Sequence, residues 1–398
     1  MTFATQPTDI STAPKYLKGA TDVTLRQRLL PRFLDEEGRI TRDATGKDLN
    51  WLIKYKLPVA VPYVQGQPLN FSNDNFNLVG TVTPEFMVAT SGMNFTEVLM
   101  NSGPTQIVNN LLARGPMLLE AMQVKFAKDL YSDANVNLRS IIGLGTLVRR
   151  STTLVCTNAD RIAVPLAGTT YAGLQLAPGS YGGGWSNNNV VKMSTVLGTD
   201  WPDGQGTPDQ IYDCTTPRLY NNNSNQWLTP GAAAANGTWA ANCLAMLSRA
   251  NTDLSMNSVK TMMPNIHLSG AERTQNIKDQ LRVSFRDTMM NNKAAENLGY
   301  YTAYNYEGAA IDVDHECPSD RTFSVCAASM DLFFYSNPAE AGGKMSVGDN
   351  SVTGGIFFFW GPTMVPGTLD YAWIMAAGGN ARYNPKWVCC HKDFTTGV

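Results

Sequence analysis

The sequence predicts an α+β fold, with its strongest helical pattern early in the chain and most of its strands in the last quarter. Apolar residues recur every three or four positions between residues 105 and 131, which is the period of an amphipathic helix. Apolar and polar residues alternate in most segments after residue 300, which is the period of a strand. With 398 residues, the chain is long enough for two or three domains and a substantial core.

Residues 1–54 are predicted to form an N-terminal arm. The segment is polar, its charges alternate in sign, and it contains few aromatic side chains. Its leucines suffice for one short helix but are too few to bury a core of their own. We therefore expect the arm to lie on something else.

Residues 55–95 predict a long two-stranded hairpin with a polar tip. The alternating positions are Val59, Val61 and Tyr63 in one strand and Leu78, Gly80 and Val82 in the other. Prolines 58, 62 and 84 cannot donate backbone hydrogen bonds, so both strands are expected at an edge and not within a sheet. Because an isolated hairpin is marginally stable in water, this one is expected to need a partner.

Residues 96–142 contain the longest predicted helix, from Thr105 to Tyr131. At 1.5 Å per residue it would be roughly 40 Å long. The Gly115-Pro116 pair in its first half is predicted to kink the helix or to divide it in two.

Residues 151–240 form an Asn- and Gly-rich insertion in which only eight positions are charged. This composition predicts short strands and long ordered loops in an elaborated surface region. Further helices are predicted at 239–256 and 270–290 from their apolar periodicity. The remaining predicted strands lie at 300–315, 322–335, 354–361 and 370–394.

The segment 310–320, AIDVDHECPSD, concentrates acids, a histidine and a cysteine. Ile311, Val313, His315 and Cys317 occupy odd positions, whereas the acids Asp312, Asp314 and Glu316 occupy even ones. In a strand these two sets lie on opposite faces. A turn follows at 318–320 and the alternation resumes at 323. We therefore predict a hairpin with one solvated acidic face.

Two chemical alternatives compete with this structural interpretation. A tetrahedral zinc site could combine His315 and Cys317 with Cys389, Cys390 and His391, but the adjacent cysteines would point to opposite faces and no CxxC pair exists. A cysteine nucleophile would need a base among His267, His315 and His391. Carboxylate pairs such as Asp35/Glu36 and Asp312/Asp314 are expected to be solvated charge. We predict no enzyme activity and no catalytic, cofactor-binding or metal-binding residue.

Composition gives little sign of a nucleic-acid or membrane partner. Lys and Arg number 31 against 33 Asp and Glu, a net charge of −2, so no cationic field is expected. The N-terminus lacks a signal-peptide pattern, and the most apolar stretch is too short to span a bilayer. Seven cysteines, an odd number, fit free buried thiols, and whether Cys389 or Cys390 is ever oxidised stays open.

Several loose motifs occur in an order that resembles the major capsid proteins of tailed bacteriophages, and the likeness spans most of residues 50–398. After the long helix come an aromatic-x-Asp run and a Gly-Leu turn, followed much later by an acidic segment, a terminal aromatic patch and a closing strand. The residues are Tyr131 to Asp133, Gly143-Leu144, Tyr306 to Gly308 with Asp314 and Pro318, Asp331 to Phe334, and 381–394.

The resemblance implies the Johnson fold, which these proteins share with herpesvirus capsid proteins. It assigns an arm to 1–54, an E-loop hairpin to 55–95, and a peripheral domain with its spine helix to 96–142. An axial domain, including the insertion 151–240, would take 143–325. The peripheral-domain strands and a closing axial strand would take 326–398.

The same resemblance implies a virion protein that forms pentamers and hexamers of an icosahedral shell around double-stranded DNA. Assembly would occur in the host bacterial cytoplasm. A separate scaffolding protein, a portal at one vertex and a decoration protein are the implied partners, with non-specific contact to packaged DNA and no membrane or cofactor. Some relatives cross-link an E-loop lysine, but Lys54 and Lys56 lie near the hairpin base, so we expect no cross-link.

The alternative from a different class is a β-rich carbohydrate-binding or carbohydrate-active protein. Tryptophans in loops stack on sugars, although they also commonly pin Gly-rich loops to a core. The tryptophans in question are Trp185, Trp201, Trp227 and Trp239. This interpretation also requires paired carboxylates at a fixed distance if sugars are cleaved.

Overall fold

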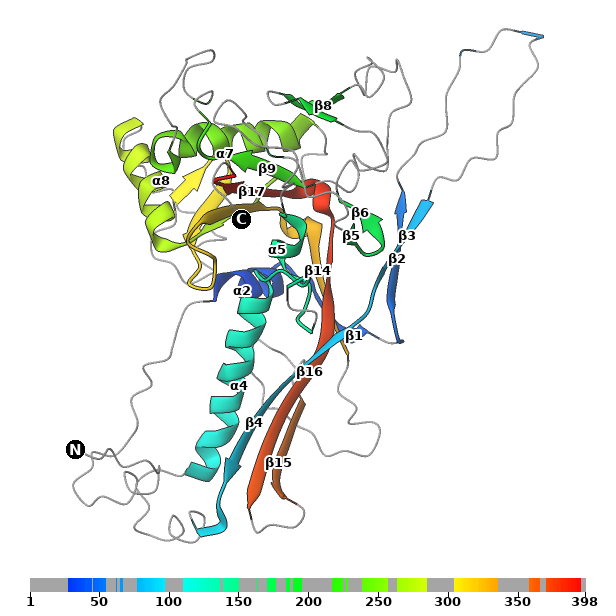
Figure 1. Ribbon diagram of the computed structural model, residues 1–398, viewed down its shortest axis with the longest axis vertical. Helices are drawn as coiled ribbons and strands as arrows, with labels where there is room; N and C mark the ends of the chain where they lie inside the picture. Colours follow the sequence, from blue (N-terminus) through cyan, green and yellow to red (C-terminus); the bar gives the residue numbers. More distant parts are fainter. Residues whose placement is uncertain are drawn as a thin grey trace.

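The computed structural model shows an elongated molecule with a compact upper body, a long lower extension and a two-stranded ribbon projecting at one side (Figure 1). The structure describes residues 28–44, 46–54, 62, 65–66, 77–96, 110–136, 139–149, 163, 170–176, 184–186, 189–194, 217–224, 227, 238–256, 263–284, 304–335, 358–365 and 370–394.

The lower extension is built on a five-stranded sheet whose longest strand is β16 (Tyr371–Tyr383). This strand pairs antiparallel with β14 (Met330–Tyr335), β15 (Phe358–Met364) and β4 (Glu85–Met93). Strand β1 (Ile40–Ala44) adds to β14 in the parallel direction.

One long helix covers one face of this sheet. Helix α4 (Asn110–Asp129) lies along β4 and β16 (Figure 1). Phe126 meets Phe334 edge to face with ring centroids 5.4 Å apart, and Met122 is buried in the same core as Met375. Because these apolar side chains recur at helical spacing on α4 and at alternate positions on the strands, the two elements share one dry interface.

The predicted division of this helix at Gly115-Pro116 is wrong, since α4 runs through both residues as one helix. A proline removes one backbone hydrogen bond, but the following turns are held by packing of Leu118, Leu119 and Met122. The predicted first turn, residues 105–109, lies outside the described residues.

The upper body contains a six-stranded sheet covered by two helices. The strand order is β11 (Tyr304–Tyr306), β12 (Ala309–Val313), β10 (Ile266–Ser269), β13 (Arg321–Val325), β17 (Val388–Lys392) and β9 (Arg218–Asn221). The helices are α7 (Trp239–Met256) and α8 (Ala271–Ser284), as the sequence predicts, although residues 285–290 lie outside the described part.

The hairpin predicted around 310–325 is wrong. Strand β10 lies between β12 and β13, pairing parallel with the first and antiparallel with the second. The acidic face is also not solvated, because Asp312 and Asp314 are 6% and 0% exposed. Both faces of these strands are covered within the chain, which is a burial pattern that alternation alone does not predict.

The ribbon pairs β2 (Leu49–Lys54) with β3 (Asn77–Val82), so the predicted partner of β3, around Val59 to Tyr63, is incorrect. The register places Trp51 opposite Gly80. A side chain at residue 80 would collide with the indole, because an added Cβ would lie 2.8 Å from it. The close fit of Trp51 over a glycine therefore explains the observed register. Most of the predicted tip, residues 67–76, lies outside the described residues.

Part of the predicted arm is folded into the body. Helix α2 (Leu29–Glu36) buries Leu30 and Leu34 completely in the main core, and Arg28 forms an ion pair with Glu120 of α4 at 3.2 Å. Residues 1–27 lie outside the described part of the chain.

The Asn- and Gly-rich region contributes short strands, as predicted, but some of them are internal. They are β5 (Thr170–Tyr171), β6 (Leu174–Gln175), β7 (Gly184–Ser186) and β8 (Asn189–Ser194), besides β9. Tyr171 is 3% exposed, and β9 is an edge strand buried on both faces. Short helices α5 (Leu144–Leu147), η3 (Ala327–Ser329) and η5 (Pro385–Trp387) complete the elements.

Asp314 joins three parts of the fold through one buried carboxylate. It follows β12 and accepts hydrogen bonds from the backbone N–H of Leu30 at 3.0 Å and from the hydroxyl of Tyr131 at 2.9 Å. Arg28, at the N-cap of α2, makes no side-chain cap hydrogen bond, so the carboxylate of Asp314 supplies that cap. A third bond, from the N–H of Glu316 at 3.0 Å, fixes the turn after β12.

The motif residues after α4 meet at the same junction. The N–H of Leu144 donates to the carbonyl of Leu130 at 2.8 Å, and Gly143 lies so close to α4 that an added Cβ would be 2.2 Å from the carbonyl oxygen of Asp129. Only glycine fits this approach. The Gly-Leu turn is therefore a packing requirement of the junction.

Replacing Asp314 should destabilise the whole chain, because it leaves three buried donors without an acceptor. These are the N–H of Leu30 in α2, the hydroxyl of Tyr131 just after α4, and the N–H of Glu316 in the turn. We expect Asp314→Ala to lower the free energy of unfolding by about 3 kcal/mol or more in urea denaturation, and Tyr131→Phe, which removes one donor, by about 1 kcal/mol. A loss below that of Tyr131→Phe would contradict the proposed role of the carboxylate.

Candidate assembly surfaces

The residues of the considered zinc site do not come together. His315 is exposed, whereas Cys317 and His391 are buried. Cys389 and Cys390 lie in different apolar clusters on the two faces of the upper sheet. Within the described residues, no three His, Cys, Asp or Glu side chains form a group that could hold a metal ion.

The described thiols are poorly suited to nucleophilic chemistry. Burial raises the pKa of Cys243 to about 12 and that of Cys390 to about 11, and it raises the pKa of Cys317 well above its usual value. The thiolate is the nucleophilic form of cysteine, so these side chains stay protonated and unreactive at neutral pH.

The acidic residues of the 310–320 segment also have structural surroundings. Burial raises the pKa of Asp312 to about 6, while one of its oxygens accepts the N–H of Val313 at 2.9 Å. The carboxylate of Asp314 accepts hydrogen bonds from Leu30 of α2 and from Tyr131 just after α4. Asp320 is drawn to Arg321 and Lys392, which outweigh its burial and lower its pKa to about 2. The prediction that the Asp312/Asp314 pair is solvated charge is therefore wrong.

The ribbon β2–β3 exposes apolar side chains on its outward face. Leu52 and Val79 face each other across the two strands, and they remain 71% and 57% exposed. The sequence signal for this exposed pair, which was not predicted, is the run of consecutive apolar residues at 51–53 and 78–79, because such runs put apolar side chains on both faces of a strand. A two-stranded ribbon by itself is marginally stable in water, and exposed apolar side chains on such a ribbon are typical of a contact surface.

The inward face of the ribbon is anchored to the body by one tryptophan. Trp51 lies against Gly80 and packs on Tyr171 with ring centroids 6.2 Å apart. The N–H of Thr81 donates to the carbonyl of Ala172 at 3.1 Å. Ala172 and Gly173 have positive φ angles, as a two-residue turn between β5 and β6 requires. The Asn- and Gly-rich region thus holds the base of the ribbon.

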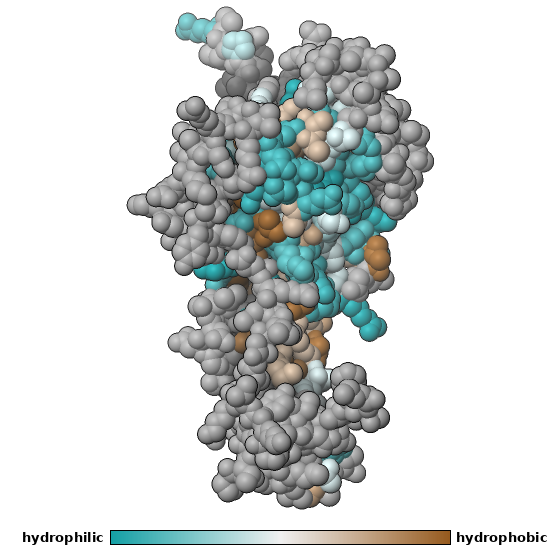
Figure 2. Space-filling model, turned by 90° about the vertical axis from the view of Figure 1, so that its left-hand side faces the viewer, coloured by the Kyte–Doolittle hydropathy of each residue, from teal (hydrophilic) through white to brown (hydrophobic). Residues whose placement is uncertain are grey.

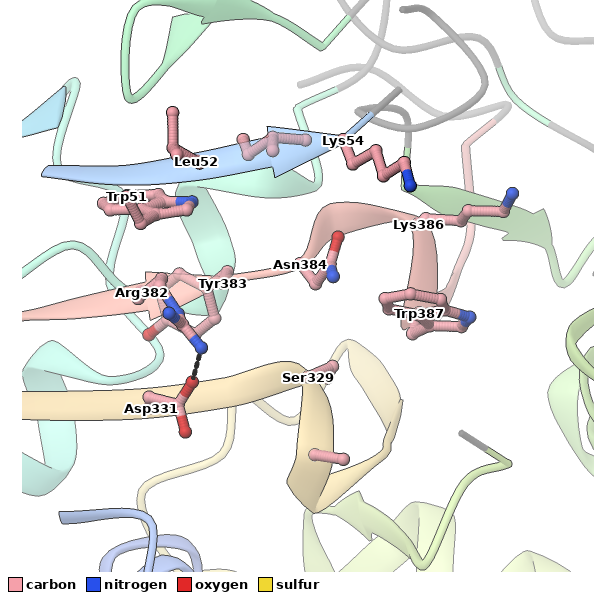
Figure 3. A pocket seen from close by; sticks show the side chains of 12 residues that line it. Trp51, Leu52, Lys54, Ser329, Asp331, Arg382, Tyr383, Asn384, Lys386 and Trp387 are labelled. Carbon is pink, nitrogen blue, oxygen red and sulfur yellow. Dashed lines mark hydrogen bonds and ion pairs between the residues drawn. The ribbon is translucent and has the colours of Figure 1, made fainter. Parts of the chain in front are cut away.

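A groove of about 390 Å³ separates strand β2 from the body (Figure 3). Lys54 and Lys386 lie at its right-hand side in the view, Asn384 lies between β2 and the body, and Arg382 forms an ion pair with Asp331. The groove is mixed in polarity and shows no convergence of acid, base and nucleophile. It marks where the ribbon separates from the body.

A second exposed apolar area lies on β4, on the sheet face opposite α4. Phe86 and Val88 are 67% and 60% exposed, and Phe86 stacks on Tyr335 with centroids 5.9 Å apart. Their neighbours on β16, Gly378 and Ala376, are small. By contrast, the side of the molecule seen in Figure 2 is mostly hydrophilic in its described upper part, with hydrophobic residues in small separate patches.

Two of the four tryptophans proposed as sugar platforms are used for packing. Trp239 is 7% exposed and donates its indole N–H to the carbonyl of Arg273 at 3.2 Å. Trp227 donates to the carbonyl of Asn221 at 2.8 Å and packs on Tyr220. The side chains of Trp185 and Trp201 lie outside the described residues.

Solved structures match this arrangement along nearly the whole chain. The capsid asymmetric unit of cyanophage A-1(L) is 15% identical, with a TM-score of 0.57 and coverage of 96% of this chain and 97% of that one. The capsid of a native GTA particle is 8% identical, with a TM-score of 0.50 and coverage of 94% and 95%. The chain has the phage capsid fold. No protein-family model matches the sequence, and no curated protein does.

The capsid fold confirms the predicted α+β class with a long helix on a sheet and a projecting hairpin. Both exposed apolar areas, on the ribbon β2–β3 and on β4, belong to described elements of this fold. None of the described helices has the length and apolar composition needed to cross a bilayer.

The fit of Trp51 over Gly80 should control how firmly the ribbon is attached. We expect Gly80→Ala to displace the indole and to weaken the attachment by about 1–3 kcal/mol, because an added methyl group overlaps it. Limited proteolysis between residues 55 and 76 should then become several-fold faster. Gly92→Ala in β4 is the matched control, since its nearest neighbour would be 3.9 Å away. Equal cleavage rates in both variants would contradict this account.

Proposed function

We propose that the protein is the major capsid protein of a tailed phage, assembling into an icosahedral shell of pentamers and hexamers around double-stranded DNA. The observation that carries the proposal is the exposed Leu52–Val79 pair on a ribbon that stands away from the body of a capsid fold. A solitary soluble protein gains nothing by exposing this pair. A shell subunit can bury it on a neighbouring copy.

The exposed apolar area on β4 is suited to form the other side of such a contact. Phe86 and Val88 lie on a sheet face, not on the ribbon, so the two areas are different surfaces of one molecule. A contact between two different surfaces is heterologous, and repeated copies of it close into rings when the rotation allows. We propose that the ribbon of one copy packs on the β4 face of the next.

The energy of one such contact is modest. Burying the exposed parts of a leucine and a valine side chain contributes roughly 2–4 kcal/mol together. A shell repeats the contact at every subunit, so weak interfaces add up to a stable particle. The predicted segments 1–27 and 55–76 would add further contacts, in keeping with the expected arm and E-loop.

The further partners remain part of the same proposal. A scaffolding protein, a portal and a decoration protein, assembly in the host cytoplasm, and non-specific contact with DNA follow from the capsid role. Contacts of the inner surface with DNA would be sensitive to salt. We also propose that the chain has no enzymatic role. Lys54 is the last residue of β2, opposite Asn77, and the absence of a cross-link stays a prediction.

Charge on the apolar ribbon face should prevent assembly without unfolding the subunit. We expect purified wild-type protein, alone or with its scaffold, to form megadalton particles by sedimentation and negative-stain imaging. Leu52→Asp and Val79→Asp should raise the concentration needed for assembly at least about tenfold, because each desolvates a carboxylate at the contact.

Asn50→Asp is the matched control, since it adds the same charge to the same face beside the pair. It should shift the assembly concentration less than either apolar replacement. Circular dichroism and urea unfolding should show intact subunits in all three variants. A wild-type protein that stays monomeric at high concentration with its scaffold would refute the proposed function.

A further inference from the structure

Two histidines are buried in the upper body and share one serine hydroxyl. His267 of β10 and His391 of β17 are both 0% exposed. The Ser324 hydroxyl of β13 lies 2.8 Å from Nδ1 of His267 and 2.9 Å from Nε2 of His391. These three side chains form a continuous polar chain across three neighbouring strands, on the sheet face that α7 and α8 cover.

These three hydrogen-bonded side chains, His267, Ser324 and His391, have no favourable site for an additional proton. The serine hydroxyl can donate to one ring and accept an N–H from the other, so two neutral rings satisfy it. A proton on the remaining inward nitrogen would leave the serine hydroxyl without an acceptor. Among the described residues, the outward nitrogens, Nε2 of His267 and Nδ1 of His391, have no hydrogen-bond partner. In the neutral state one of them already carries the proton of its ring. A second proton, on the outward nitrogen of the ring that donates to the serine, would place an unsatisfied charge in the interior.

The guanidinium of Arg273 next to His391 disfavours an added positive charge on that ring. Arg273 of α8 stacks on Trp239 of α7 at 4.6 Å and donates to the carbonyl of His391 at 3.1 Å. Tyr220 of β9 stacks on His391 with ring centroids 5.1 Å apart. Cys243 of α7 and Cys389 of β17 belong to the same cluster, and Arg218 is buried at the start of β9.

No described carboxylate offsets these cations at the two rings. Asp320, which interacts with Arg273, forms ion pairs with Arg321 and Lys392. Asp312 is on β12, where the residue before it, Ile311, faces the helices, so its side chain projects to the other side of the sheet. The described hydrogen bonds of both rings go to Ser324.

We propose that the His267–Ser324–His391 chain is an acid-sensitive latch that holds the α7–α8 layer on the six-stranded sheet. While both rings are neutral, the serine hydroxyl makes both of its hydrogen bonds and the layer stays closed. Protonation of either ring releases the layer, because the imidazolium reaches water only when α7 and α8 move away. The latch acts within a single subunit, so it does not depend on the proposed capsid role.

The direction of the pH effect follows from the two states. Burial lowers the pKa of His267 from 6.5 to about 4 and lowers the pKa of His391 well below its usual value, with His267 and Arg273 adding to the effect. Between pH 6.5 and 4 the open state therefore binds protons that the closed state does not. Opening becomes more favourable as the pH falls through this window, and the contribution of His267 levels off below about pH 4.

Hydrogen–deuterium exchange measured by mass spectrometry tests this latch. After correction for intrinsic exchange rates, peptides of α7 and α8 should show an opening constant at least about 50-fold larger at pH 4.5 than at pH 7. Peptides of β16 in the lower sheet should change much less. His267→Gln and His391→Gln should each reduce this increase, because glutamine can hydrogen-bond Ser324 but does not titrate in this range.

His315→Gln, which removes the exposed histidine, is the matched control and should keep the full increase. Should a buried-site variant fold poorly, exchange of the imidazole C2 hydrogen in the wild-type protein decides the matter. Midpoints below pH 5 for His267 and His391 support the latch. Midpoints near 6.5, an unchanged increase in both variants, or equal opening of β16 would overturn it.

Discussion

A single buried carboxylate determines how the N-terminal segment, the long helix and the upper sheet meet. Helix α2 has no side-chain cap of its own, and the positive end of its dipole is directed at Asp314. Tyr131, just beyond the end of α4, donates to the same carboxylate oxygen. The buried charge is thus stabilised by a helix N-terminus and by oriented N–H and O–H dipoles. Because elements far apart in the sequence share this one hydrogen-bond acceptor, a shift of any of them would break a hydrogen bond to it.

The two sheets are packed within the chain itself, whereas the ribbon leaves apolar side chains exposed. Strand β16 leads through η5 directly into β17, so the lower and upper sheets are joined by a short continuous stretch of backbone. The ribbon β2–β3 instead touches the body at its base, through Trp51 and Thr81. Its outward face exposes the apolar pair Leu52 and Val79 among polar residues. This contrast separates the parts of the chain that fold within one molecule from the part that a neighbouring copy would complete.

Local sequence patterns predicted the helices well. Strand partners and the burial of polar faces depend on long-range packing, which local patterns do not contain. Helix α7 has the predicted bounds because its apolar spacing is regular along its whole length. The partner of β3 was wrong because segments 49–54 and 59–63 both fit an apolar strand, and only the fit of Trp51 on Gly80 distinguishes them. The acidic face of 310–316 was predicted to be solvated because α2 and Tyr131, which cover it, lie more than 180 residues away. The exposed pair Leu52–Val79 could have been found from its consecutive apolar neighbours.

The parallel pairing of β1 with β14 has a consequence for synthesis. The contact between Arg39 and Asp331 spans 292 residues, and β4 pairs with positions beyond 370. At a translation rate of 5–20 residues per second, the N-terminal segment waits roughly 15–60 s on the ribosome before its partners emerge. During that interval the methionines of β4 lack their partners on β16, so the lower sheet can be completed only after the last quarter of the chain has been made.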